Sequence, residues 1–587
     1  MSFGTFAIYF KNKYKMLKLI KSGLMLAISG SVLFVTGCGI QKMIKKAGSI
    51  SYVAKPNPLE LHGDSVKITV TGVFPTKFFH KKAIVMATPV VKYAGGEKEL
   101  KSVTLRGDKV EGAGQNISFT EGGKFTYTDQ FLYVKGMEKS EVVLRATAQY
   151  KSKTTNLPEV SIAKGVIATP LLLKSDYKAI IAVDKFDKNP TVTQKANIYF
   201  LVDSWEIRNI ELTSDESENM IRFINRAAKS GSDLSSMEIY GFASPEGELS
   251  RNSKLSDNRA DEAYKVMLAR FNKAKLKGLD KKDGFYKKVV TDFEDWDGLK
   301  QMLQTSTLNG KDEALKIINT LGDPEAREAE FKKMASFDPI YDAYFPKLRR
   351  AEINLVARIK TRNDEQIYKL ALETPDSLGM EELLYASTLV FTNSDKLAIY
   401  KAFSRLFPED YRGFNNVGAM YVSQGKINEA QAEFEKAQKI AGDNATIKNN
   451  LGVVAAMKGD RKTASNYFDA AGTLAEVNHN KGNLQVASGK YSIATSSYGS
   501  ECSFNAALAK LLSGNTAGAT QTIDCSEDKD SAEGFYLRAV IAARSSNKEG
   551  VVGNLTKAIS SKPDLKNKAK SDMEFEKFSA DLAGVLN

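Results

Sequence analysis

Residues that bind metals or act as nucleophiles are scarce in this chain of 587 residues. It has three histidines and three cysteines, and His62, His80 and His479 are each isolated in the sequence. No cluster has the spacing of metal ligands, and no G-x-S-x-G nucleophile motif is present. Ser244 has no neighbouring histidine or lysine to serve as its base. We therefore expect no enzyme activity, no metal and no cofactor. A hidden enzyme acting on the cell wall is the alternative from that class.

Proline is also scarce, with 14 residues, whereas hydrophobic residues make up 42% of the chain. This composition argues against long disordered segments. The chain is too long for one core, so we expect three or more domains. The net charge of +13 falls to +8 without residues 1–37, which contain five lysines and no acidic residue. The remaining lysines are scattered, which favours a solvated surface and no nucleic-acid partner.

The first 37 residues combine a basic segment with an apolar run. Five lysines precede the run 24–35, which is shorter than the roughly 20 residues needed to span a bilayer. Val-Thr-Gly-Cys at positions 35–38 resembles a bacterial lipobox. The resemblance implies a signal peptide over residues 1–37 and acylation of Cys38. A retained transmembrane anchor is the alternative, and Met16 is a second candidate for the true start.

The residues that follow Cys38 bear on the destination of the protein. They are Gly-Ile-Gln-Lys, with no aspartate and no acidic cluster. By analogy with lipoprotein sorting, this absence favours the outer membrane, with the protein lipid-anchored and facing the periplasm. We expect residues 38–50 to form a short basic tether. A fimbrial or adhesive protein on the cell surface is another interpretation.

Alternating apolar and polar residues with glycine turns run from about residue 51 to 175. Examples are the runs 66–71, 83–88, 124–128 and 141–150. Period-two alternation is typical of half-buried strands. The pattern predicts an antiparallel β-sandwich, which we interpret as a spacer or partner-binding domain.

From residue 190 to 360, strand and helix patterns alternate. We expect strands at 196–201, 237–240, 289–293 and 345–358, and helices at 214–230 and 257–271. Ser214 and the acidic residues after it have the pattern of a capped helix start. Residues 299–344 add two or three further helices.

The loop after the second of these strands carries a motif. Glycines at 241 and 247 bound Phe-Ala-Ser-Pro-Glu, and N-x-x-L-S-x-x-R-A follows at positions 252–260. This order resembles the signature of OmpA-like domains, which hold the peptide stem of peptidoglycan. Arg-Arg-Ala-Glu-Ile at positions 349–353 resembles the closing strand of that family. The resemblance implies a central α+β domain with a helical insertion at 299–344.

The resemblance also implies a binding site. The family's arginine, which grips the carboxylate of diaminopimelate, falls on Arg259, and Asn252 also matches the motif. The family's aspartate, which grips the ammonium group, is replaced by Ser244. We expect Arg259 to lie on the first turn of a helix and to bind a carboxylate with help from helix N–H groups. Glu246 is a candidate to replace the missing aspartate. The alternative is that Arg259 pairs within the fold and the loop binds protein or nothing.

Residues 378–587 contain an internal repeat. A pattern of Gly418, Gly425, Ala430 and Phe434 recurs 34 residues later, and weaker copies follow it. This period and these residue types resemble the tetratricopeptide repeat, a pair of antiparallel helices. The resemblance implies an all-α solenoid whose concave face binds protein partners. The alternative is a purely structural brace.

Cys502 and Cys525 are the two cysteines that remain after lipidation of Cys38. In the repeat pattern, Cys502 opens the first helix of a pair and Cys525 closes the second. Antiparallel helices return the chain to its starting level, so the two are candidates for a disulfide in an oxidising compartment. Two unpaired thiols are the alternative.

These features together predict a non-enzymatic scaffold made of a β-sandwich, an OmpA-like domain and a tetratricopeptide solenoid. The acyl chains would insert in the outer membrane, the central domain would bind the peptidoglycan stem peptide, and the repeats would recruit envelope proteins. The alternative is an accessory subunit of an outer-membrane assembly or secretion machine, whose central domain does not bind peptidoglycan.

Overall fold

The computed structural model describes residues 38–291 and 293–587, and the predicted signal peptide lies outside them. The described chain forms two compact units. The first contains residues up to Ile180 together with Ala445–Asn587, and the second contains Ile181–Asn444. This grouping differs from the predicted succession of three domains. The β domain belongs to the same unit as the C-terminal helices, and the helical region is divided between the units.

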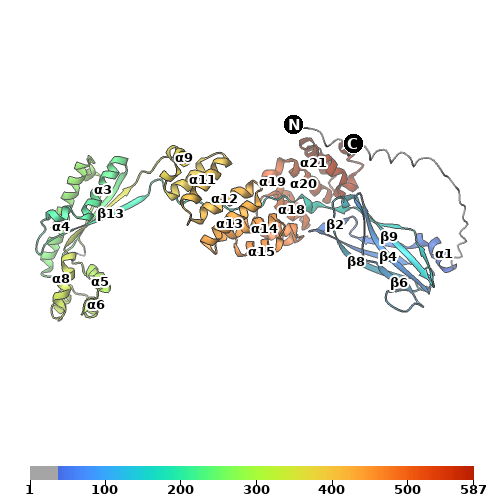
Figure 1. The fold of residues 1–587 in the computed structure, drawn as a ribbon, viewed down its shortest axis with the longest axis horizontal. Coiled ribbons are helices and arrows are strands. Elements are labelled where there is room, and N and C mark those ends of the chain that lie inside the picture. Colours follow the sequence, from blue (N-terminus) through green and yellow to red (C-terminus); the bar gives the residue numbers. More distant parts are fainter. Residues whose placement is uncertain (1–37, 292) are drawn as a thin grey trace, which may run out of the picture. The chain divides into compact units, whose positions relative to one another are not determined.

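The first unit begins with a β domain built from two sheets (Figure 1). Strand pairs are antiparallel except β2–β12 and β6–β7. The predicted β-rich N-terminal region is therefore confirmed. One sheet contains β1 (Ser51–Lys55), β2 (Leu59–His62), β3 (Ser65–Phe74), β8 (Gly123–Leu132) and β12 (Val166–Ile167). The other contains β4 (Ala83–Tyr93), β5 (Gly96–Glu99), β6 (Val103–Gly107), β7 (Gln115–Ile117), β9 (Glu141–Tyr150), β10 (Lys153–Asn156) and β11 (Val160–Lys164).

The two sheets enclose one hydrophobic core. Along β8, Phe125, Tyr127 and Phe131 are buried and alternate with exposed residues, as expected for a strand with one wet face. The segment predicted as a tether contributes to the same core. It begins with helix α1 (Cys38–Lys45), and Ile40 and Met43 are buried among the residues of the β domain. The predicted short basic tether instead begins with a helix that packs on the β domain, because these apolar residues, three positions apart, lie on one helix face.

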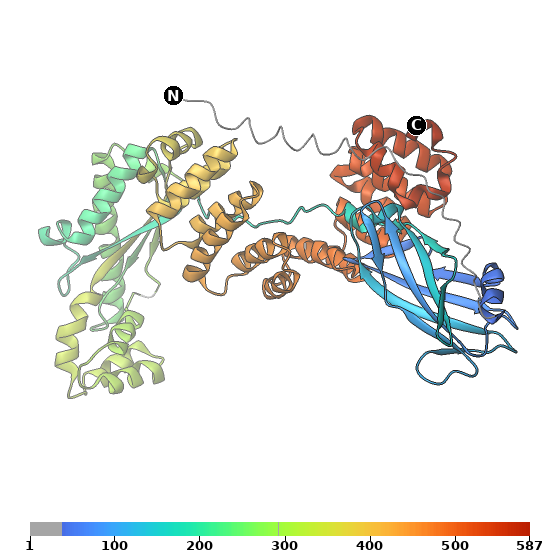
Figure 2. The ribbon, with the colours of Figure 1, turned by 45° about the vertical axis from the view of Figure 1, so that its right-hand side comes forward.

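Residues 445–587 of the first unit are mainly helical (Figure 2, orange to red). Successive helices pair as antiparallel hairpins, and their small and aromatic residues explain why. A side-chain carbon at Gly452 would lie 2.6 Å from the ring of Phe468, and one at Gly482 would lie 2.5 Å from Tyr498. In these two pairs the first helix therefore needs glycine where the aromatic residue of the second helix packs. The helices are α14 (Ala445–Met457), α15 (Arg461–Ala470), α16 (Ala475–Ala487), α17 (Tyr491–Tyr498), α18 (Phe504–Leu512), α19 (Thr516–Cys525), α20 (Ala532–Arg544), α21 (Lys548–Ser561), α22 (Leu565–Ser571) and α23 (Ala583–Leu586).

A disulfide joins Cys502 to Cys525, with their Cα atoms 5.6 Å apart. Cys525 ends α19, as the sequence suggested. Cys502 lies in the loop two residues before α18, so it does not open that helix. Both cysteines are exposed.

Reduction of this disulfide is expected to destabilise the α18–α19 hairpin by about 3 kcal/mol, because the bond closes a loop with a sequence separation of 23 residues. Hydrogen exchange of the two helices with and without reductant measures the effect. The double variant Cys502→Ser, Cys525→Ser is the control and should not respond to reductant. Equal exchange in the reduced and oxidised protein would contradict the expectation.

The second unit contains an α+β domain with a sheet in the order β13-β16-β14-β15. β16 pairs antiparallel with β13 and β14, while β14 and β15 are parallel. Alternate residues of β16 are buried in one core with residues of α3 and α4. The elements are β13 (Thr191–Tyr199), α2 (Asn209–Leu212), α3 (Asp215–Ser230), β14 (Asp233–Gly241), α4 (Leu249–Lys273), β15 (Tyr286–Val289), α5 (Trp296–Gln304), α6 (Lys311–Thr320), α7 (Pro324–Phe331), α8 (Phe337–Leu348) and β16 (Arg350–Arg358).

Several boundaries in this domain differ from the predictions. The third strand is β15, which ends at Val289 where the prediction had it begin. Residues 345–348 belong to α8, although they were assigned to the last strand. Helix α4 begins at Leu249, eight residues before the predicted start. Four helices, α5 to α8, occupy the region for which two or three were expected.

The second unit ends with helices, of which α9 to α12 share one core. Gly418 of α12 packs against Phe434 of α13 in the way described for the first unit. The C-terminal region is therefore all-helical, as predicted. These helices are α9 (Asp364–Glu373), α10 (Met380–Leu389), α11 (Asn393–Leu406), α12 (Tyr411–Ser423) and α13 (Ile427–Ala441). Across the described residues, every helix is too short or too polar to cross a bilayer.

Candidate functional sites

The four residues predicted to bind peptidoglycan surround one cavity in the α+β domain. The loop 241–247 connects β14 to α4 and forms part of its wall. The cavity has a volume of about 410 Å³. Its lining includes Ser244, Glu246, Asn252 and Arg259, together with Asp203, Arg251, Lys332, Tyr341 and Arg349.

The glycine that opens the loop is required by close packing. A side-chain carbon at Gly241 would lie 2.0 Å from the carbonyl oxygen of Ser256 in α4. The hydroxyl of Ser256 donates to the carbonyl oxygens of Asn252 and Phe293, so it ties the helix to a second loop. These contacts place the loop and the helix side by side and account for much of the sequence motif.

Arg259 is 1% exposed and is held by the main chain. Its Nε and Nη1 atoms each donate to a carbonyl oxygen at 2.9 Å, on Ser204 and Phe242, and Nη2 donates to Leu201 at 3.2 Å. Burial lowers the pKa of Arg259 to about 10. The residue lies in the third turn of α4, because the helix starts ten residues earlier than Arg259. The prediction of a guanidinium on the first turn, free to bind a carboxylate beside helix N–H groups, was therefore wrong.

Glu246 has an internal partner as well. Its carboxylate accepts from Arg349 at 2.8 Å and from the hydroxyl of Ser244 at 2.5 Å. The side chain of Arg349 is 7% exposed, and its buried Nε–H has no acceptor among the described residues. Arg349 was assigned to the closing strand from the sequence, and its role at the cavity was not predicted. Its signal was present in the paired arginines at the start of the strand.

Asn252 holds the loop 241–247 through hydrogen bonds from its side chain. Its side-chain amide donates to the carbonyl oxygens of Ser244 and Glu246 and to the carboxylate of Glu294. Burial raises the pKa of Glu294, although its bonds from Asn252 and Trp296 oppose the shift. Ser244 and Asn252 are both buried. The buried side chains of Arg259, Ser244 and Asn252 therefore fix the shape of the loop.

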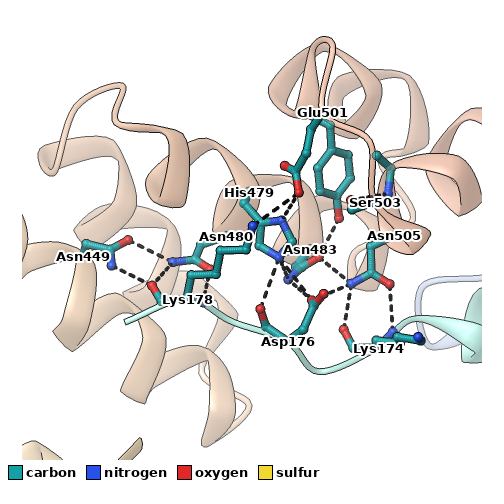
Figure 3. Close-up of polar contacts among 12 residues, drawn as sticks. Lys174, Asp176, Lys178, Asn449, His479, Asn480, Asn483, Glu501, Ser503 and Asn505 are labelled. Carbon is teal, nitrogen blue, oxygen red and sulfur yellow. Dashed lines mark hydrogen bonds and ion pairs between the residues drawn. The ribbon is translucent and has the colours of Figure 1, made fainter. Parts of the chain in front are cut away.

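A second site lies in the first unit, where the chain's own segment 174–180 crosses the helical repeats (Figure 3). The segment has no regular structure, and its main chain is bound by asparagine side chains. The N–H and C=O of Lys178 pair with the amide of Asn480 at 2.7 and 2.9 Å. Asn450 binds Ile180 in the same way, at 2.7 and 2.8 Å. Each such amide matches one residue of an extended peptide as a neighbouring strand would.

The same pairing recurs at Lys174, which Asn505 binds at 2.9 and 2.8 Å. Asn450, Asn480 and Asn505 lie on the first helices of three successive hairpins and are buried. Each stands nine residues before a glycine with positive φ, at 459, 489 and 514. This recurrence was visible in the sequence but was not recognised, because the repeat was identified only from its packing residues.

One position of the segment is bound through its side chain. The carboxylate of Asp176 accepts from Asn483 at 2.8 Å and from Asn505 at 2.7 Å, and lies 3.2 Å from Nε2 of His479 (Figure 3). Nδ1 of His479 lies 2.6 Å from the carboxylate of Glu501. The buried imidazole therefore stands between two carboxylates.

The charge of His479 depends on these partners. Burial alone would lower its pKa, but hydrogen bonds and charge interactions with Asp176 and Glu501 outweigh burial and raise the pKa to about 9. The imidazolium is thus the dominant form at neutral pH. His479 appeared isolated in the sequence because its partners lie far from it along the chain.

The surface of α14, α16 and α18 that binds segment 174–180 is called the groove below, and its stability is expected to fall at alkaline pH. A raised pKa stabilises the fold fully below the unfolded value of 6.5, and the contribution is lost as pH rises through about 9. The unfolding midpoint of the wild type should therefore drop by a few degrees more between pH 7 and pH 10 than that of His479→Gln. Parallel pH profiles for the two proteins would contradict this expectation.

In the second unit, residues 182–185, which follow this segment in the chain, are bound in a similar manner. The N–H and C=O of Ala182 pair with the amide of Asn416 in α12 at 2.8 and 2.9 Å. Glu381 accepts from the N–H of Lys185 at 2.6 Å and forms an ion pair with Arg412. Asn416 again stands nine residues before a glycine with positive φ, Gly425.

Within the described residues, no three histidine, cysteine or acidic side chains are arranged to hold a metal ion. No known protein family matches the sequence, and a comparison with curated proteins finds no match.

Solved structures do match parts of the chain. YrrB, a tetratricopeptide protein with an unusual peptide-binding site, is 22% identical, with 34% of this chain and 95% of YrrB covered and a TM-score of 0.21. PilW, a type IV pilus biogenesis factor, is 18% identical, with 35% and 95% covered and a TM-score of 0.25. PilF of Pseudomonas aeruginosa is 13% identical, with 37% and 97% covered and a TM-score of 0.26. Likenesses this distant assign no function to the chain.

Proposed function

We propose that this protein is a non-enzymatic scaffold that recruits other proteins through its helical repeats. The observation that carries the proposal is the asparagine series, which binds an extended segment by its main chain. Such a surface suits segments of varied sequence. We place the scaffold in the periplasm, lipid-anchored to the outer membrane through Cys38, on the basis of the lipobox and the residues that follow it.

Two measurements test this proposal. Wild-type protein should incorporate labelled palmitate and fractionate with the outer membrane, whereas Cys38→Ser should do neither. Crosslinking in living cells followed by mass spectrometry should then recover envelope proteins attached to the helices α12–α19. A protein that remains soluble when Cys38 is intact would overturn the location, and a crosslinked sample without any partner would overturn the scaffold.

We further propose that the cavity beside the loop 241–247 binds the peptide stem of peptidoglycan. Four cations line it, Arg251, Arg259, Lys332 and Arg349, against two acidic residues, Asp203 and Glu246. The excess of positive charge and the unpaired Nε–H of Arg349 suit a ligand with carboxylates. Arg251 and Arg349 take the role first assigned to Arg259.

Binding to purified sacculi tests this second proposal. Arg251→Ala should weaken binding about tenfold, because one charge-assisted hydrogen bond to the ligand is lost. Lys265→Ala is the matched control, since this residue of α4 does not line the cavity. Equal binding by all three proteins would discard the proposal.

The alternative is an accessory subunit of an outer-membrane assembly or secretion machine, with the α+β domain as an interaction module. Two observations favour it, the serine at position 244 and the saturation of Arg259 by main-chain carbonyl oxygens. A stoichiometric complex purified from detergent without muropeptides would support this version.

A further inference from the structure

The helical groove of the first unit is already filled. Segment 174–180 lies against α14, α16 and α18, and its main-chain groups at three residues are paired with asparagine amides. A partner that used the same amides would have to take the place of this segment. The groove is therefore closed to partners in the described structure.

The contacts of the segment are of three kinds: main-chain pairings, a bound carboxylate, and ion-pair and ring contacts of other side chains. At Lys174, Lys178 and Ile180 the groove pairs with main-chain N–H and C=O groups, so these pairings place no demand on side-chain identity. At position 176 the groove binds a carboxylate through Asn483, Asn505 and the charged His479. Other side chains of the segment add to the binding: the ammonium groups of Lys174 and Lys178 lie 2.6 Å from Asp528 and 3.4 Å from Glu501, and Tyr177 stacks on Phe468. The carboxylate at position 176 is the feature that three groove side chains contact together.

The strength of the closure depends on Asp176. Its side chain is 42% exposed, so the carboxylate is near solvent and can leave without the opening of a core. Most side chains of the segment are exposed or half-buried. Bonds between the main chain and an amide can be exchanged one for one with those of another peptide.

We propose that segment 174–180 is a resident ligand of this groove, which a partner's extended peptide displaces when that peptide carries an acidic residue at the place of Asp176. The inference deepens the proposed scaffold function by naming the class of partner and the contact that keeps the groove closed. Tethering gives the segment an effective concentration in the millimolar range, so a free peptide competes poorly with an intact segment.

Fluorescence anisotropy of the full-length protein tests the inference. The probe is a labelled peptide with the sequence of residues 173–181, made with aspartate or with asparagine at the fourth position. Asp176→Asn weakens the resident segment, so this variant should bind the aspartate peptide at least tenfold more tightly than the wild type does. It should bind the asparagine peptide at least tenfold more weakly than the aspartate peptide.

Ser175→Ala is the matched control, because Ser175 is exposed on the same segment, and it should behave as the wild type. Hydrogen exchange of α14–α18 shows that each variant is folded. It also gives a second readout, since excess aspartate peptide should speed exchange at Lys178 and Ile180 in the wild type.

Absence of peptide binding by Asp176→Asn would overturn the inference, and so would equal binding of the two peptides. In either case the segment would be a structural part of the fold that no peptide displaces. Because the probe is the chain's own sequence, this result does not depend on whether the crosslinking experiment finds a partner.

Discussion

Arg259→Ala is expected to destabilise the α+β domain by about 4 kcal/mol, whether or not a ligand binds there. The substitution removes a large, fully buried side chain and its three bonds to main-chain carbonyl oxygens. Those bonds fasten the segment after β13 to the start of the loop 241–247. Hydrogen exchange of β14 and β16 measures the loss, with β9 of the first unit as an internal reference.

Arg251→Ala provides the matched control on the same cavity. Arg251 is half-exposed and pairs with exposed Asp203 at 2.6 Å, so its loss should cost less than about 1 kcal/mol. If Arg259→Ala left exchange in β14 and β16 unchanged while abolishing binding to sacculi, Arg259 would be a ligand-binding residue and its assignment as a structural residue would fail.

Asn480→Asp is expected to release segment 174–180 and to destabilise the groove by about 4 kcal/mol. The change is nearly isosteric but puts a carboxylate where Asn480 now donates to the carbonyl oxygen of Lys178 and to the side-chain oxygen of Asn449. The residue is 0% exposed, so the new charge would be buried facing two acceptors. Hydrogen exchange of residues 174–180 and of α16 reports the effect.

Asn567→Asp is the control for this change, because it makes the same substitution at an exposed position on α22 of the same unit. Its effect should lie within about 0.5 kcal/mol. A folded Asn480→Asp protein with unchanged protection at Lys178 would contradict the expectation. It would mean that the introduced carboxyl group is protonated or that the main-chain bonds add little.

The sequence predicts best those elements whose pattern is local. The run 141–150 alternates over most of its length and is the strand β9, and the helix predicted to end at residue 230 does so at Ser230. The repeat period identified the hairpins because glycine and an aromatic residue recur at fixed offsets. Boundaries fail where polar residues continue a helix, as at the start of α4, because its first turns contain no strong apolar pattern.

What the sequence cannot reveal is pairing between distant residues. Arg259 lines the cavity, but two of its three carbonyl partners come from a loop more than fifty residues away. His479 and Asp176 are separated by 303 residues, so nothing near His479 predicts its charge. The inclusion of α1 in the β-domain core depends on Ile40 and Met43, two apolar residues within a basic stretch.

Helix α1 has a consequence for how the protein would stand on a membrane. Cys38 is its first residue, and Ile40, two positions later, is already buried in the β domain. Two residues of helix span only about 3 Å. Acyl chains on Cys38 would therefore be joined to the β domain by almost no linker. The β domain would lie at the lipid headgroups, and the first unit could not extend far into the periplasm.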